Sequence, residues 1–208
     1  MRTQLILTTA ALGLASLGAS AQVYSVNAVG YVNLSLPAGS KLVLVANQLN
    51  NGDNTLKTVV PTAAEGTLVY TYAQASGFAT AGFEFGEWSA NPVIGPGVGF
   101  FAASPTAATI TLVGEVPQGT LNTALLSGLN LVSSQVPQAG KLGTDLKYTP
   151  AEGDIVYQWD AAAQGYKAAN GFEFGEWSGG EPTIGVGEGF FLSKAAAGSW
   201  SRTFSVNQ

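Results

Sequence analysis

The octapeptide GFEFGEWS occurs twice in the chain, at residues 82–89 and again at residues 171–178. Each copy contains two glutamates and a tryptophan, and together these residues are Glu84, Glu87, Trp88, Glu173, Glu176 and Trp177. Two carboxyl groups roughly 5 to 10 Å apart that flank a sugar bond are the catalytic pair of a glycosidase. Glycoside hydrolysis is therefore one hypothesis for the octapeptide.

Two other interpretations of the octapeptide stay open. A glycan-binding site needs exposed aromatic rings for stacking and acidic groups that accept hydrogen bonds, and Trp159 joins the six residues as a candidate for it. Folding alone is the third interpretation: in a strand, Phe83 and Phe85 share a core-facing side while Glu84 faces outward. The next glycine permits a bend, and Trp88 closes the edge of the core. The structural interpretation is favoured.

Several kinds of chemistry are closed to the chain because the residues for them are absent. It has no cysteine and no histidine, and its only methionine is Met1. A Ser-His-Asp triad and a zinc site built on imidazole or thiolate are therefore excluded. We expect no metal site, no cofactor and a non-enzymatic role, with a fold held by core packing.

Two further motifs have structural explanations. The segments PVIGPGVGFF and PTIGVGEGFF have a glycine at every second position, as some nucleotide-binding loops do, but they lack the G-x-G-x-x-G spacing between a strand and a helix. Each therefore predicts a tight turn that leads into a core strand. The segment NQLNNGDNTL around Asp53 lacks the spacing and the closing glutamate of an EF-hand, so it predicts a polar turn. Weak calcium binding stays open there.

The repetition extends beyond the octapeptide. LVLVANQL matches LNLVSSQV, and AEGTLVYTY matches AEGDIVYQW. These matches predict a tandem duplication of a roughly 85-residue antiparallel β repeat, with residues 22–117 as the first repeat and residues 118–208 as the second. We expect a pseudo-two-fold arrangement, as two domains or as one integrated domain, in which similar segments at the start (YSVN) and the end (FSVN) of the chain lie near each other.

The fold class follows from the spacing of hydrophobic residues. Segments such as TLVYTY and TITLV are rich in β-branched and aromatic residues, and turn signals recur about every ten residues. This pattern predicts an all-β fold with sandwich or barrel-like sheets. One short helix is expected at residues 120–128 (TLNTALLSG).

The first residues and the charge indicate where the protein works. Residues 1–21 have a positive start, an apolar stretch and a terminal ASA, which is the pattern of a signal peptide. We therefore expect a secreted, periplasmic or cell-surface protein without a transmembrane segment. Only 10% of residues are charged and the net charge is −5, so we expect no nucleic-acid partner. The expected partner is another copy, an envelope component or a glycan.

The order of motifs in the second repeat resembles a known β-rich module. GLNLVSSQVP, DIVYQWD and IGVGEGFFL are similar to the G-x-N-L-V, Y-x-W and G-x-G-F-F strands of secreted surface proteins of Gram-negative bacteria. The start VYSVNAVGYVNLSLPAG resembles uncharacterised exported proteins of Verrucomicrobia-like bacteria. The resemblance implies export and a β fold, and no functional residue carries over from it. The favoured function is an exported structural or interaction protein, with a glycan-binding module as the alternative and a glycoside hydrolase as a remote one.

Overall fold

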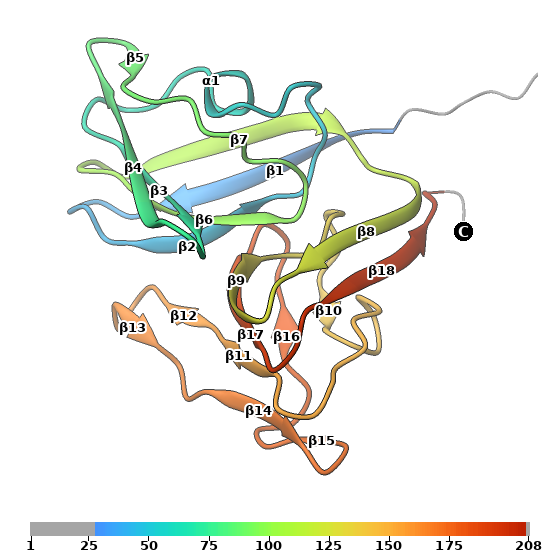
Figure 1. Ribbon diagram of the computed structural model, residues 1–208. Helices are drawn as coiled ribbons and strands as arrows, with labels where there is room; N and C mark the ends of the chain where they lie inside the picture. Colours follow the sequence, from blue (N-terminus) through green and yellow to red (C-terminus); the bar gives the residue numbers. More distant parts are fainter. Residues whose placement is uncertain (1–27, 207–208) are drawn as a thin grey trace, which may run out of the picture.

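The computed structural model describes residues 28–206, so the expected signal peptide lies outside the described residues. Within that range the protein is all-β with antiparallel sheets, as predicted, and α1 (Leu56–Val59) is its one helix. Figure 1 shows two halves, one above the other, with the linker between them at the right.

The N-terminal half comprises residues 28–117. Its strands are β1 (Val29–Leu36), β2 (Val43–Asn47), β3 (Leu68–Ala73), β4 (Gly77–Glu84), β5 (Glu87–Trp88), β6 (Val98–Ala103) and β7 (Ala108–Glu115). Strands β1 and β7 form a two-stranded sheet. The other five pair in the order β2-β6-β3-β4-β5.

The C-terminal half comprises residues 118–206 and repeats this order of pairing. Its strands are β8 (Gly119–Leu125), β9 (Gly128–Val132), β10 (Gly140–Lys141), β11 (Ile155–Tyr157), β12 (Trp159–Asp160), β13 (Gly165–Tyr166), β14 (Asn170–Glu173), β15 (Glu176–Trp177), β16 (Thr183–Ile184), β17 (Phe190–Lys194) and β18 (Gly198–Phe204). Strands β8 and β18 form a two-stranded sheet, and five others pair in the order β9-β17-β11-β14-β15. Two short pairs, β10–β16 and β12–β13, complete this half.

Each half has two layers with its own hydrophobic core between them. In the N-terminal half, Leu34 and Leu112 from the β1–β7 sheet are buried in one cluster with Phe100 of β6. In the C-terminal half, Trp200 from the β8–β18 sheet is buried in one cluster with Phe190 of β17. The alternation of buried and exposed residues along these strands places every second side chain in the core, which is why the period of two predicted strands.

The two halves join along one sheet. Val98 of β6 pairs with Val132 of β9, and this pairing merges the larger sheets into one sheet of ten strands. The sheet is open, with β5 and β15 at its ends, so the barrel-like alternative is wrong for residues 28–206.

The segment at residues 120–128 differs from its prediction. Its residues 120–125 belong to strand β8 in place of a short helix, because all seven residues of β8 pair in register with β18. Leu125 is buried while the residues before it alternate in exposure, as on a strand.

The two ends of the described chain meet at the linker between the halves. The amide of Val116 donates to the carbonyl oxygen of Ala28 at 2.7 Å, and the amide of Val206 donates to Oε1 of Gln118 at 3.2 Å. Residues 28 and 206 therefore both lie beside the linker at residues 116–118.

Candidate functional site

Each octapeptide forms a tight β-hairpin with a phenylalanine at its tip. Phe85 and Gly86 have φ of 54° and 79°, and Phe174 and Gly175 have φ of 55° and 79°. Two consecutive positive φ angles define a two-residue type I′ turn, in which Asn-Gly is the usual sequence. A phenylalanine in the left-handed region is rare and costs about 1–2 kcal/mol. The two copies therefore share the same unfavourable choice of residue.

A glutamate from the preceding loop holds each hairpin tip. The carboxylate of Glu65 accepts hydrogen bonds from the amides of Phe85 (2.9 Å) and Gly86 (2.8 Å). The carboxylate of Glu152 accepts two bonds of 2.8 Å from the corresponding amides of the second hairpin. Sequence reasoning did not single out these two glutamates, although they lie in the repeated AEG segments and could have been found there.

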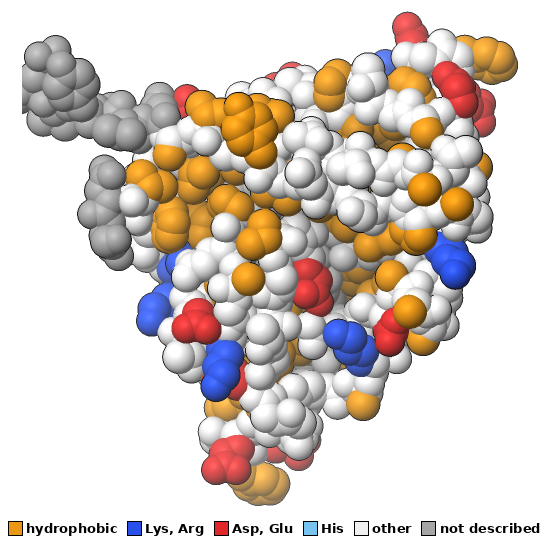
Figure 2. Space-filling model, turned by 180° about the vertical axis from the view of Figure 1, so that it is seen from behind, with side chains coloured by type: hydrophobic (Ala, Val, Ile, Leu, Met, Phe, Trp, Pro, Cys, Tyr) orange, Lys and Arg blue, Asp and Glu red, His pale blue; other side chains and the backbone are white. Residues whose placement is uncertain are grey.

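The prediction that both phenylalanines of the octapeptide face the core is wrong for the phenylalanine at the tip. Phe83 is buried as expected, but Phe85 is 97% exposed and Phe174 is 96% exposed. The reason is that the strand ends at Glu84 and the chain reverses within the next two residues, so the alternation of faces stops there. Figure 2 shows a hydrophobic side chain flanked by acidic ones at the top right and at the bottom of the molecule.

The four glutamates of the octapeptides are not brought together. Glu84 pairs with Glu87 across one hairpin and Glu173 with Glu176 across the other, and all four are exposed. The β4–β5 and β14–β15 hairpins lie at opposite ends of the molecule (Figure 1). A hollow of about 340 Å³ beside the first pair is lined only by that hairpin. One hairpin supplies a single wall, whereas a glycosidase encloses the sugar bond between its two carboxyl groups.

The predicted site tryptophans have three different environments. Trp88 is buried and its Nε1 donates to the carbonyl oxygen of Val60 at 2.7 Å, so it belongs to the core. Trp177 is half-buried and packs edge-on against Phe172 at 5.2 Å. Trp159 lies far from both hairpins, between the two halves of the molecule.

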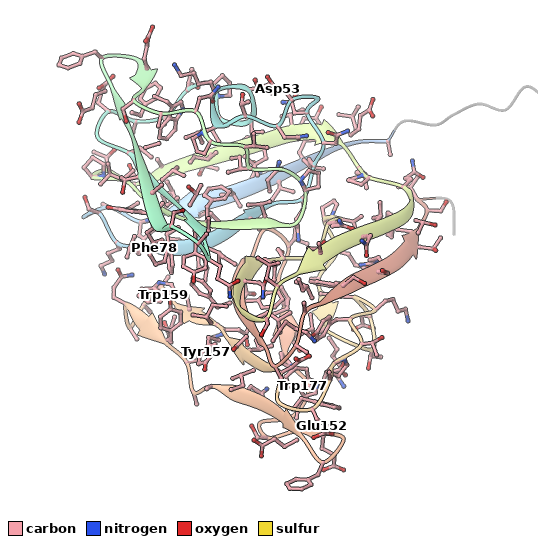
Figure 3. All side chains as sticks on the ribbon, in the orientation of Figure 1. Asp53, Phe78, Glu152, Tyr157, Trp159 and Trp177 are labelled. Atoms are coloured by element: carbon pink, nitrogen blue, oxygen red, sulfur yellow. The ribbon has the colours of Figure 1, made fainter. Side chains whose placement is uncertain are left out.

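Trp159 belongs to an aromatic groove that runs between the halves. One lobe of the groove has a volume of about 410 Å³ and the other about 500 Å³, and Phe78 and Tyr166 line both lobes. Figure 3 shows Phe78, Trp159 and Tyr157 close together on this side of the molecule. We call the two lobes together the aromatic groove.

The two lobes use matched residues from the two halves. The first lobe has Leu42, Tyr70 and Phe101 of the N-terminal half, together with Trp159 from the other half. The second lobe has Leu129, Tyr157 and Phe191 of the C-terminal half, together with Tyr72 from the other half. These residues occupy corresponding places in the repeated motifs, which explains why the lobes have similar size and lining.

Contacts across the halves fix the walls of the groove. Nε1 of Trp159 donates to the carbonyl oxygen of Leu42 at 2.9 Å, and Gln164 both donates to that oxygen and accepts from the Leu42 amide. In the opposite direction, the side chain of Gln74 donates to the carbonyl oxygen of Ser127. The groove is therefore formed before any ligand arrives.

The chemistry of the aromatic groove is almost entirely apolar. No charged residue lines either lobe, and the polar groups of its lining are hydroxyls, for example those of Thr80 and Ser193. Burial raises the pKa of Tyr166 above its ordinary value, which favours the neutral hydroxyl. Phe78 and Tyr166 nevertheless remain 54% and 49% exposed. Such a surface favours an apolar or aromatic group as its occupant.

Sequence reasoning found only Trp159 among the groove residues. A usable signal was present in YTY and YQW, where two aromatic side chains at alternate positions share one strand face. The residue before each pair, Val69 or Val156, is buried in the core of its half. The aromatic face therefore points away from that core and toward the other half.

The polar loop at Asp53 uses its oxygens within the loop. The Asp53 carboxylate accepts from the Thr55 amide at 3.0 Å and from the hydroxyls of Thr55 and Thr58. The Thr55 amide is the main cause that lowers the pKa of Asp53. Among residues 28–206, no three acidic side chains gather in a way that could hold a metal ion.

Comparison with protein-family models, with curated proteins and with solved structures found no match to the chain. In the described part of the chain, no helix has the length and hydrophobicity needed to cross a membrane.

Proposed function

We propose that the protein is an exported, non-enzymatic interaction protein that links two partner surfaces through its hairpin tips. The observation that carries this proposal is the pair of fully exposed phenylalanines, Phe85 and Phe174, on two hairpins of the same construction. Each of these phenylalanines has a positive φ angle, which is unfavourable for a residue with a side chain. Each also exposes a large apolar ring to water. Residues that the surrounding structure holds in an unfavourable backbone conformation are concentrated at functional sites.

A tandem duplication with pseudo-two-fold symmetry accounts for the two tips. Its support comes from reciprocal contacts at the junction: the amide of Ala46 donates to the carbonyl of Gly187 at 2.8 Å, and the amide of Ser133 donates to the carbonyl of Gly97 at 2.9 Å. Residues 46 and 133 match in the repeats, and so do residues 97 and 187. Each half thus gives the other the same bond that it receives, as in an isologous contact.

The tips suit a binding role because they are rigid. The glutamate that accepts two amide hydrogen bonds fixes each turn, so little conformational entropy is lost when a partner binds. The two carboxylates beside each ring add a negative rim. A partner surface with an apolar pocket and basic residues around it therefore fits the tip.

The proposal is tested by replacing the tips and measuring retention on envelope fractions of the producing cell. We expect Phe85→Ser together with Phe174→Ser to abolish retention, and each single variant to weaken it strongly because two-point attachment is lost. Tyr31→Thr is the matched control, because Tyr31 is also a highly exposed aromatic residue but lies on β1. Retention of the double variant at the wild-type level would show that the tips are not the binding elements.

A glycan-binding function is a second candidate because Trp159 lines a preformed groove of aromatic rings. Sugars stack on such rings through their apolar faces. Tryptophan fluorescence should then change on titration with a soluble polysaccharide, and Trp159→Ala should remove the response while Trp88→Phe keeps it. A panel of common polysaccharides without any response would eliminate this candidate.

A further inference from the structure

We infer that the aromatic groove receives a hairpin tip from a second copy of the same chain. This inference rests on the proposed function, because it names the partner surface that the tips bind. Its basis is the coexistence on one molecule of two exposed phenylalanine tips and two apolar aromatic lobes.

The apolar complementarity follows from the surfaces described above. A phenylalanine that is fully buried removes roughly 150–250 Å² of its surface from water. The tip rings are almost completely exposed, and each lobe, at about 410 Å³ or about 500 Å³, has room for one ring and part of the adjacent turn. The lobe walls present ring edges and faces, with which an inserted ring forms offset or edge-on contacts.

The charges next to the two surfaces differ in sign. The tips carry only carboxylates, whereas exposed lysines are the chain neighbours of two groove residues: Lys41 precedes Leu42, and Lys167 follows Tyr166. Lys167 also attracts the carboxylate of Asp160 and contributes to the lowering of its pKa. Attraction between an acidic tip and these lysines would orient the tip as it enters.

A tip cannot reach the groove of its own molecule. Phe78 stands near the start of β4 and Phe85 follows the end of that strand, so seven residues of extended chain hold them roughly 23 Å apart. The second hairpin lies at the far end of the other half (Figure 1). The contact is therefore between molecules, and because tip and groove are different surfaces it is heterologous, which allows rings and open chains.

Each contact is small. One ring and its flanking turn bury much less than the roughly 1,200 Å² of a stable interface, so a single contact is weak. Two tips and two lobes per molecule raise the overall avidity. Association should therefore grow with protein concentration and extend beyond a dimer.

The experiment is sedimentation velocity over a concentration series, with complementation between two defective variants. The tip variant combines Phe85→Ser with Phe174→Ser, and the groove variant combines Phe78→Ser with Tyr166→Ser. We expect the wild type to assemble progressively and each variant alone to remain monomeric. An equimolar mixture should form mixed assemblies that contain both variants, because one variant keeps intact grooves and the other keeps intact tips.

Circular dichroism and cooperative urea unfolding confirm that each variant is folded, and Phe172→Ser is a control at the base of a hairpin. A mixture that stays monomeric would overturn the inference, as would a wild type that stays monomeric at the highest concentration. The proposed function has a separate readout: if the groove variant keeps envelope retention while the tip variant loses it, the tips bind another partner. If neither variant loses retention, the proposed function fails as well.

Discussion

Gly99 and Gly189 lie against each other where the two halves meet, and a Cβ atom added to Gly189 would stand 3.4 Å from the Cα of Gly99. The same Cβ would come within 2.5 Å of the carbonyl oxygen of Val45, which is backbone and cannot move aside. We expect Gly189→Ala to lower the free energy of unfolding by about 1–3 kcal/mol. Urea unfolding measures it, with Gly95→Ala as a near-neutral control because that site is open.

The two octapeptide tryptophans should differ in their contribution to stability. Trp88→Phe leaves the buried carbonyl of Val60 without its donor, so we expect a loss of about 1–3 kcal/mol. Trp177 stands at the same place in the second octapeptide but is only half-buried, so Trp177→Phe should cost less than about 1 kcal/mol. Equal losses in thermal or urea unfolding would contradict the assignment of Trp88 to the core.

The glutamate that binds each hairpin tip should slow the hydrogen exchange of the two tip amides. Glu65→Ala removes the acceptor for the amides of Phe85 and Gly86, so their hydrogen exchange should accelerate while the second hairpin is unchanged. Glu84→Ala provides the control, since that glutamate is exposed and belongs to the same hairpin. Exchange that is as slow in Glu65→Ala as in the wild type would mean that the turn needs no support.

The C-terminal half has a buried ion pair that the N-terminal half lacks. Lys194 lies 2.6 Å from the carboxylate of Asp154, and the corresponding buried residues are Ser104 and Thr67. Removing one partner strands the other charge, so Lys194→Met should cost about 3–5 kcal/mol. The double variant Lys194→Met with Asp154→Leu should lose less stability than either single variant. Calorimetry of the three variants measures these losses. Losses in the single variants that add up in the double variant would show that the two residues are not coupled.

Tyr148 should not ionise in an alkaline titration of the folded protein. Its hydroxyl donates to Asp154, and burial raises its pKa far above the ordinary 10.0. Because the unfolded tyrosine ionises near pH 10, its contribution to stability is complete below that pH and is lost as the pH rises further. The tyrosinate absorbance of the native protein should therefore keep its amplitude in Tyr148→Phe, and a loss of amplitude in this variant would contradict the burial of Tyr148.

Sequence reasoning predicted the local elements well. The segments TLVYTY and TITLV form strands β3 and β7, and the glycines before Phe100 and Phe190 mark turns into core strands. Local patterns suffice here because each strand needs only its own alternation and a turn at its end. The helix expected at residues 120–128 was wrong because pairing with β18 outweighed the local preference of that segment.

The candidate sites were harder to predict from the sequence than the strands were. The core prediction for Phe85 was wrong because a two-residue turn, stabilised by Glu65 from another loop, ends the strand one residue earlier than the pattern suggests. The aromatic groove depends on which faces of the two halves meet, and the paired aromatic residues of YTY and YQW do not by themselves reveal that packing between distant segments. Only Trp159 was selected, on account of its residue type.

The reciprocal hydrogen bonds between Ala46 and Gly187 and between Ser133 and Gly97 have a consequence for assembly during synthesis. Since both halves present equivalent edges, the contact itself does not distinguish a half of the same chain from one belonging to a neighbouring molecule. The short connection at residues 116–118 makes that distinction, because it keeps the correct partner at a high effective concentration. Cutting the chain there should give two fragments that recombine, and lengthening it should favour exchange of halves between molecules.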